Sequence, residues 1–253
     1  MDPRLEVMVE AARAGGAAAL DHYRRGFSVS LKADRSPVTE ADREAERAIV
    51  GVLRARCPDY GTLGEELGES GPGVRRFIVD PIDGTRNFVR RIPTWAVLIA
   101  LEEAGRVTAG VVYQPVTGVL HTAGLGAGAY RDGERIRVSP VDALERALVV
   151  HSSVNFLRRS AYWEGFLRLA DRTQVQRGLG DFSAYLWVAE GQGEIALSTT
   201  VKAWDVAALK IIVEEAGGRL TDLDGRSGIY GHTVFATNGL LHDPALEAMR
   251  ADV

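Results

Sequence analysis

Apolar residues recur at helical spacing in two stretches near the start of the chain. The first stretch predicts an amphipathic helix over residues 5–23. The second predicts a helix over residues 41–57, which Thr39 or its neighbours cap and which ends before Pro58. The residues that follow, 60–73, are polar and rich in glycine, so they predict a loop.

Short apolar runs broken by turn residues come next and indicate strands. Residues 27–42 predict a short strand and a loop between the two helices, and the runs at 76–80 and 95–101 predict further strands. Residues 107–138 predict an antiparallel meander, because each short run ends at Gly, Pro or Asp-Gly. The first part of the chain is therefore expected to be α+β with an antiparallel sheet.

From about residue 141 the pattern changes to an alternation of strands and helices, which is typical of an α/β fold. In chain order we expect a strand at 147–153, a helix at 156–172, a strand at 174–179, a helix at 181–191, a strand at 194–198, a helix at 204–218, and closing strands at 218–225 and 233–238. A boundary near residue 140 then gives an α+β domain over residues 1–140 and an α/β domain over residues 141–253.

Composition and charge narrow the function classes. The 253 residues are 46% hydrophobic and 25% charged, which is ordinary for a soluble globular protein with a core. The formal charge of −4 supplies no basic field for nucleic acid or for a membrane surface. The longest apolar run, at 95–101, is too short to cross a bilayer, and the N-terminus lacks the pattern of a secretion signal. The single Cys57 excludes an internal disulfide and a cysteine-rich zinc site, so we expect a cytoplasmic protein.

Four acidic residues occupy unusual places. Asp80 and Asp83 crowd around a proline where the strand FIVD ends in FIVDPIDGTRNF, and Glu65 lies in the Gly-flanked stretch GEEL. Asp205 opens an apolar helix, where a helix cap explains it equally well when it is considered alone. Together the four offer hard oxygen ligands without His or Cys, a set that suits Mg²⁺, with Mn²⁺ as a substitute.

The residues between and after these acids indicate a phosphate site. Asp80 can bridge two ions, and Pro81 shapes a turn from which the Ile82 carbonyl can point inward as a further ligand. Gly84 allows a tight bend, and Thr85 can begin a short helix whose N–H groups hold an anion. Metals beside a phosphate site predict the hydrolysis of a phosphate monoester by a metal-activated water.

Three motifs in this order resemble the inositol monophosphatase family of metal-dependent phosphatases: the Gly-Glu-Glu stretch, DPIDGTRNF and WDVAALKIIVEEAGG. The similarity extends from KADRSPVTEADREAE at 32–46 to the stretch AGGRLTDLDG. The resemblance implies a layered αβαβα sandwich of the sugar-phosphatase type, usually a homodimer, with lithium-sensitive catalysis by two or three Mg²⁺ ions in many members. It also implies one metal site from Glu65, Asp80 and the Ile82 carbonyl, and a second from Asp80, Asp83 and Asp205.

The same resemblance implies roles for residues beside the metals. Thr85 and Asp42 match a hydrogen-bonded pair that orients the attacking water together with Glu65. Gly84 and Thr85 match the backbone amides that receive the phosphate. Stretches such as SPVTEADREAE and QRGLGDFSAY are similar to the bacterial histidinol-phosphatase branch of the family, so histidinol phosphate is the expected substrate.

The residues around the expected leaving group keep alternatives open. Asp181 either contacts a cationic substrate amine or caps the helix that follows it, and Arg177 faces either the pocket or solvent. Ser198 stands where these phosphatases usually carry an acid that contacts the substrate. The alternative substrates are inositol-1-phosphate, fructose-1,6-bisphosphate and 3′-phosphoadenosine 5′-phosphate, and the alternative from another class is a catalytically idle binding subunit.

Overall fold

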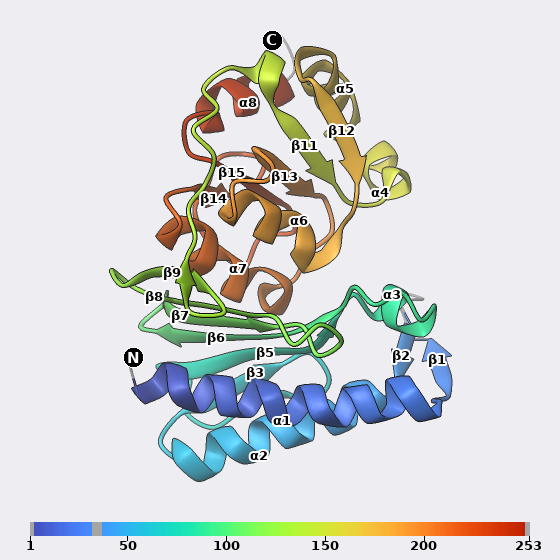
Figure 1. Cartoon of the computed structure of the whole chain (residues 1–253), viewed down its shortest axis with the longest axis vertical. Helices are drawn as coiled ribbons and strands as arrows, with labels where there is room; N and C mark the ends of the chain where they lie inside the picture. The colour runs from blue at the N-terminus through green and yellow to red at the C-terminus, as the bar shows by residue number, and fades with distance from the viewer. Residues whose placement is uncertain (1–2, 32–36, 251–253) are drawn as a thin grey trace.

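The computed structural model describes residues 3–31 and 37–250, and it has five layers that alternate between helices and sheets (Figure 1). The outermost layer holds α1 (Pro3–Arg25) and α2 (Glu40–Arg56), which pack on an eight-stranded sheet. The central layer holds α6 (Asp181–Ala189) and α7 (Ala203–Glu215), which lie between that sheet and a five-stranded sheet. This arrangement confirms the predicted layered αβαβα sandwich.

The eight-stranded sheet is almost entirely antiparallel and has the order β10-β9-β8-β7-β6-β5-β3-β4, in which only β3 and β5 run parallel. Its strands are β3 (Gly61–Gly64), β4 (Gly68–Ser70), β5 (Arg75–Asp83), β6 (Ala96–Glu103), β7 (Arg106–Tyr113), β8 (Leu120–Gly124), β9 (Gly128–Arg131) and β10 (Glu134–Arg135). Side chains alternate between its two faces. Phe77 and Val79 of β5 join the core under α1 and α2, whereas Ile78 joins the core under α7.

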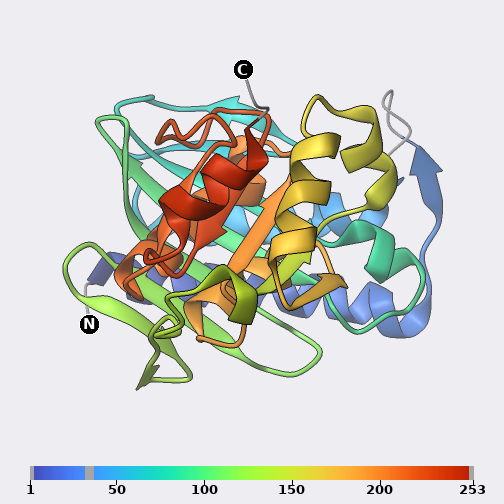
Figure 2. The same ribbon diagram turned by 90° about the horizontal axis from the view of Figure 1, so that it is seen from above.

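The five-stranded sheet is mixed and has the order β12-β11-β13-β15-β14. Its strands are β11 (Leu148–His151), β12 (Val175–Gly178), β13 (Ile195–Ser198), β14 (Arg219–Thr221) and β15 (Val234–Thr237). Strands β12, β11 and β13 are parallel, so their carboxyl ends share one edge. The last layer contains α4 (Val154–Arg159), α5 (Trp163–Arg172) and α8 (His242–Met249), which cover the far face of this sheet (Figure 2).

Smaller elements complete the chain. Strands β1 (Val29–Leu31) and β2 (Pro37–Thr39) form a separate hairpin, α3 (Thr85–Val89) follows β5, and a 3-10 turn spans Leu144–Arg146. The predicted loop within 27–42 falls largely on residues 32–36, which lie outside the described residues. Within residues 3–31 and 37–250, none of the helices combines the length and the apolar character that a membrane span needs.

Most predicted elements are confirmed, and the exceptions have physical reasons. Residues 60–73 do not form a loop throughout: they contain β3, which pairs with β5, and β4, which pairs with β3, and this pairing overrides their low strand propensity. The predicted helix at 156–172 is two helices, α4 and α5, interrupted after Arg159. The final strand of the predicted meander is short: β10 spans Glu134–Arg135, and after it the Ile136 N–H donates to the Ala129 carbonyl of β9. Helix α8 was not predicted.

Candidate metal centre

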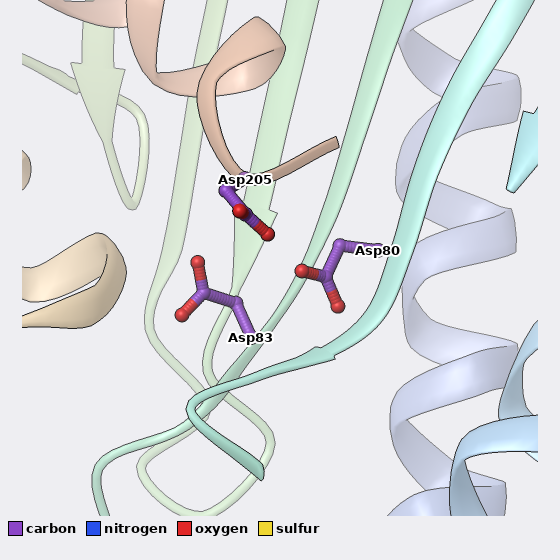
Figure 3. A group of neighbouring side chains, drawn as sticks. All are labelled: Asp80, Asp83 and Asp205. Carbon is purple, nitrogen blue, oxygen red and sulfur yellow. The ribbon is translucent and has the colours of Figure 1, made fainter. Parts of the chain in front are cut away.

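Asp80 and Asp83 lie where β5 departs from the regular register of β6. Asp80 is opposite Leu98 and Asp83 is opposite Ala96, so three steps along β5 match two steps along β6. Residues three apart on a regular strand point to opposite faces, and the extra residue of this bulge returns them to the same side. Pro81, which has no N–H to donate to the sheet, lies within the bulge. Figure 3 shows both aspartate side chains near Asp205.

Asp205 reaches the same centre from the first turn of α7. Its Oδ2 accepts the Lys202 N–H at 2.7 Å, so the predicted helix cap is present. One ligand oxygen from each of Asp80, Asp83 and Asp205 lies within 4.8 Å of the others. The cap therefore does not remove Asp205 from the acidic cluster, and the two interpretations of this residue are compatible.

Burial disfavours the ionised forms of the carboxylates in this cluster. It raises the pKa values of Asp80 and Asp83 well above their ordinary range, and neighbouring carboxylates raise them further. Burial also raises the pKa of Asp205 to about 7. A divalent cation among the three would favour their ionised forms, and a donor set made only of carboxylate oxygens suits a hard cation such as Mg²⁺. The residues present therefore fit a metal site.

Glu65 lies beside the three aspartates, in the turn between β3 and β4. Its N–H donates to the Val79 carbonyl at 3.2 Å, which fixes its backbone next to the residue before Asp80. Its carboxylate is not in the group of oxygens within 4.8 Å of one another, but its charge raises the pKa values of Asp80 and Asp205. The structure thus brings Glu65 to the cluster as its neighbour.

Thr85 connects this centre to the start of α2. Its hydroxyl donates to the Ile82 carbonyl at 2.9 Å and lies 3.5 Å from Asp42 Oδ1, at the limit of a hydrogen bond. Asp42 is buried, and its Oδ2 accepts the N–H and the hydroxyl of Thr39 at 2.7 and 2.8 Å. The bond from the Thr39 N–H is one half of the capping box of α2. Burial outweighs these bonds and raises the pKa of Asp42 to about 6.

Gly84 forms the tight bend that the sequence predicts between β5 and α3. Its φ of +88° is in the left-handed region, which glycine adopts without strain. A Cβ at this position would lie 3.0 Å from the Thr94 carbonyl and 3.5 Å from Asp181 Oδ2. The backbone conformation and the close approach of the Thr94 carbonyl therefore both favour glycine at this bend.

Asp181 approaches this bend from α6. Its Oδ2 accepts the Asn87 side-chain amide at 3.1 Å, and burial raises its pKa. Its side chain does not cap α6; instead Asp83 Oδ1 accepts the Phe182 N–H at 3.3 Å in the first turn of that helix. The charge of Asp181 in turn raises the pKa of Asp83. The structure thus places Asp181 at the edge of the acidic cluster.

The other two residues named from the sequence have contrasting surroundings. Arg177 is exposed on β12 and donates to the Gln176 carbonyl at 3.0 Å. Ser198 is the last residue of β13 and is buried. Sequence reasoning missed Asn87, the partner of Asp181, and Glu46, a buried acid on α2. The position of Glu46 one helical turn after Asp42 was the signal available for it.

A layered αβαβα sandwich with a buried carboxylate cluster beside its central helices defines the class of metal-dependent phosphatases to which this fold and site correspond. The chain belongs to the inositol monophosphatase family, whose family model matches residues 1–251. It is a phosphoric monoester hydrolase of this metal-dependent family.

Relatives and solved structures agree with this assignment over nearly the whole chain. A histidinol-phosphatase of Mycobacterium tuberculosis is 44% identical over 97% of this chain and 98% of that protein. A histidinol-phosphatase of Streptomyces coelicolor is 40% identical over 93% and 92%. The solved structure of an IMPase from Thermotoga maritima matches with a TM-score of 0.88 at 36% identity, over 98% of this chain and 97% of that chain.

Proposed function

We propose that this protein is a Mg²⁺-dependent phosphomonoesterase that hydrolyses histidinol phosphate. The convergence of Asp80, Asp83 and Asp205 carries the metal-dependent chemistry. Three curated relatives at 40–44% identity, all named histidinol-phosphatases, support the substrate. We further propose a cytoplasmic homodimer that binds no nucleic acid or membrane, with domains over residues 1–140 and 141–253, the second of which contributes Asp205.

In this proposal two sets of ligands share one residue. Glu65, Asp80 and the Ile82 carbonyl would hold one ion, and Asp80, Asp83 and Asp205 would hold another. A third Mg²⁺ could bind as well, and Mn²⁺ could take the place of Mg²⁺. When bound, Mg²⁺ lowers the pKa of a water and stabilises charge on the phosphoryl oxygens. The Ile82 carbonyl already accepts the Thr85 hydroxyl and has a second lone pair for an ion.

Three residues orient the attacking water in this proposal: Glu65, Thr85 and Asp42. The Thr85 hydroxyl donates its single hydrogen bond to the Ile82 carbonyl, so its oxygen remains an acceptor for the water. Asp42 lies behind it with a pKa of about 6, which allows it to exchange a proton with its neighbours close to neutral pH. The backbone amides of Gly84 and Thr85 receive the phosphate.

In this proposal Asp181 makes the site prefer a substrate with a cationic group. Desolvation raises the pKa of its carboxylate, and a cationic substrate amine beside it would favour the ionised form. Asn87 holds Oδ2 of this carboxylate in place. Arg177, exposed at the neighbouring strand β12, is assigned to the rim, where it meets the outer edge of the bound substrate.

A substrate panel tests the proposal. Phosphate release is measured with saturating Mg²⁺ for histidinol phosphate, inositol-1-phosphate, fructose-1,6-bisphosphate and 3′-phosphoadenosine 5′-phosphate. We expect the highest kcat/KM for histidinol phosphate. The variant Asp80→Asn is expected to lose several kcal/mol of transition-state stabilisation, about a hundredfold or more in kcat. Undiminished activity of this variant would refute the assignment of the metals.

Inositol-1-phosphate is the second candidate substrate. The observation in its favour is an inositol-1-monophosphatase of Mesorhizobium japonicum, which is 36% identical over 97% of this chain. Histidinol phosphate carries an amine and inositol phosphate does not, so the charge of Asp181 discriminates between them. A clear preference of the wild-type protein for inositol-1-phosphate would overturn the first choice.

A further inference from the structure

Glu46 is a fully buried acid of α2 for which the proposed mechanism has no use. It lies one helical turn after Asp42, on the same face of the helix. Its Oε2 accepts the Glu66 N–H at 2.8 Å, and its Oε1 accepts the Leu67 N–H at 3.1 Å. Both carboxylate oxygens are therefore bonded to the backbone of the turn that carries Glu65.

Gly64 shows how closely this carboxylate approaches the turn. A Cβ at Gly64 would collide with Oε1 of Glu46, and it would lie 2.6 Å from Cδ of the same side chain. The φ of Gly64 is not in the left-handed region, so the space and not the backbone conformation requires a glycine. Gly64 and the N–H groups of Glu66 and Leu67 thus enclose the Glu46 carboxylate, and we call this enclosure the socket. Glu65 lies between Gly64 and Glu66 in the chain.

The other side of Glu65 is attached to the sheet. Its N–H donates to the Val79 carbonyl at 3.2 Å, and Val79 directly precedes Asp80 on β5. The backbone of Glu65 is therefore held between two anchors, β5 before it and Glu46 after it. With both anchors in place, the turn cannot shift relative to Asp80 without breaking hydrogen bonds of buried groups.

We propose that Glu46 is a positioning residue for Glu65, which it holds at the metal centre by fixing the backbone of the β3–β4 turn. The proposal rests on the proposed function, in which Glu65 is a metal ligand. Both oxygens of Glu46 accept backbone N–H groups of the turn, and Glu46 is outside the group of converging oxygens formed by Asp80, Asp83 and Asp205, so its role is assigned to the turn. Residues that orient metal ligands typically change metal affinity or activity about 10- to 100-fold when they are replaced.

The main test is the variant Glu46→Gln. Glutamine keeps the volume but offers one acceptor oxygen, so its NH₂ group faces a backbone N–H that loses its partner. We expect Mn²⁺ affinity, measured by calorimetry without substrate, to fall about 10- to 100-fold. We expect hydrogen exchange of the Glu66 and Leu67 amides to become faster. At saturating metal, kcat should fall more than KM changes.

Glu194→Gln is the matched control. Glu194 is also buried and accepts a backbone N–H, that of Leu148, at 2.6 Å, together with the Ser139 hydroxyl at 2.8 Å. It directly precedes β13, whereas Ser198 is the last residue of that strand. We expect this variant to lose stability in urea while it keeps the wild-type Mn²⁺ affinity. Gly64→Ala is a second test, because its new Cβ would displace the Glu46 carboxylate from the turn without removing either glutamate from the chain.

The outcomes separate the two proposals. If Glu46→Gln and Gly64→Ala bind Mn²⁺ as tightly as wild type, the positioning role is wrong even where amide exchange is faster. If wild type itself binds no Mn²⁺ and releases no phosphate, the proposed function is wrong and the positioning role falls with it. Weakened Mn²⁺ binding in both socket variants, but not in Glu194→Gln, supports the inference.

Discussion

Replacing Asp205 by asparagine should make the metal-free protein more stable while it weakens the response to Mg²⁺. The pKa of Asp205 is raised from 3.8 to about 7, first by burial and then by the charge of Glu65. Asparagine keeps an oxygen that can accept the Lys202 N–H, so the cap of α7 is preserved. The substitution therefore removes a carboxylate that is unfavourable without a cation and leaves the local fold in place.

The magnitude follows from the difference between the folded and unfolded pKa values. Each pKa unit corresponds to about 1.4 kcal/mol, so ionised Asp205 costs the metal-free folded state at most about 4 kcal/mol. The folded pKa lies above the unfolded one, so the folded state binds the proton more tightly. The contribution of Asp205 to the free energy of unfolding in EDTA should consequently fall as pH rises from about 4 to about 7, and this contribution should change little beyond that range.

Urea unfolding of wild type and Asp205→Asn, in EDTA and in Mg²⁺ on both sides of this pH range, measures the effect. Asp59→Asn, at an exposed aspartate, controls for the change in net charge. Above pH 7 in EDTA we expect the Asp205 variant to be more stable than wild type. In Mg²⁺ wild type should gain more stability than the variant, because the ion binds only the folded state. The reasoning would be refuted if the variant were less stable than wild type in EDTA. It would also be refuted if the free energy of unfolding of the two proteins depended equally on pH.

Three further predictions concern single residues. Gly84→Ala should lose about 1–2 kcal/mol and most phosphate release, because φ is +88° and the new Cβ lies 3.0 Å from the Thr94 carbonyl; an unchanged urea midpoint would contradict this. Burial lowers the pKa of His242 from 6.5 to about 4. The contribution of His242 to the free energy of unfolding should therefore be constant above pH 6.5 and should fall by about 3 kcal/mol as pH drops from 6.5 through about 4. His242→Gln should lose this pH dependence, and a retained slope would exclude His242 as its source. Asp181→Asn should raise KM for histidinol phosphate about tenfold and leave KM for inositol-1-phosphate unchanged; equal shifts would argue against an amine contact.

Local patterns in the sequence predicted what they determine locally. The helical periodicity and Thr39 placed α2 and its cap correctly, and Asp132-Gly133 marked the turn between β9 and β10. Strands β3 and β4 escaped prediction because glycine-rich residues have low strand propensity and pair only in the context of β5. The break between α4 and α5 lies at Ser160, whose hydroxyl donates to the Leu157 carbonyl and accepts the Tyr162 N–H.

The candidate site shows the same division at the level of side chains. Residue type and order pointed to Asp80, Asp83 and Asp205, but a regular strand would place Asp80 and Asp83 on opposite faces of the sheet. Only the bulge against β6 turns both toward Asp205, and the pairing register that creates it is a long-range property. Pro81 is the local sign of that bulge. A proline between two acids at the end of a strand therefore indicates a bulge that brings both side chains to the same face of the sheet, where one cation can bind them.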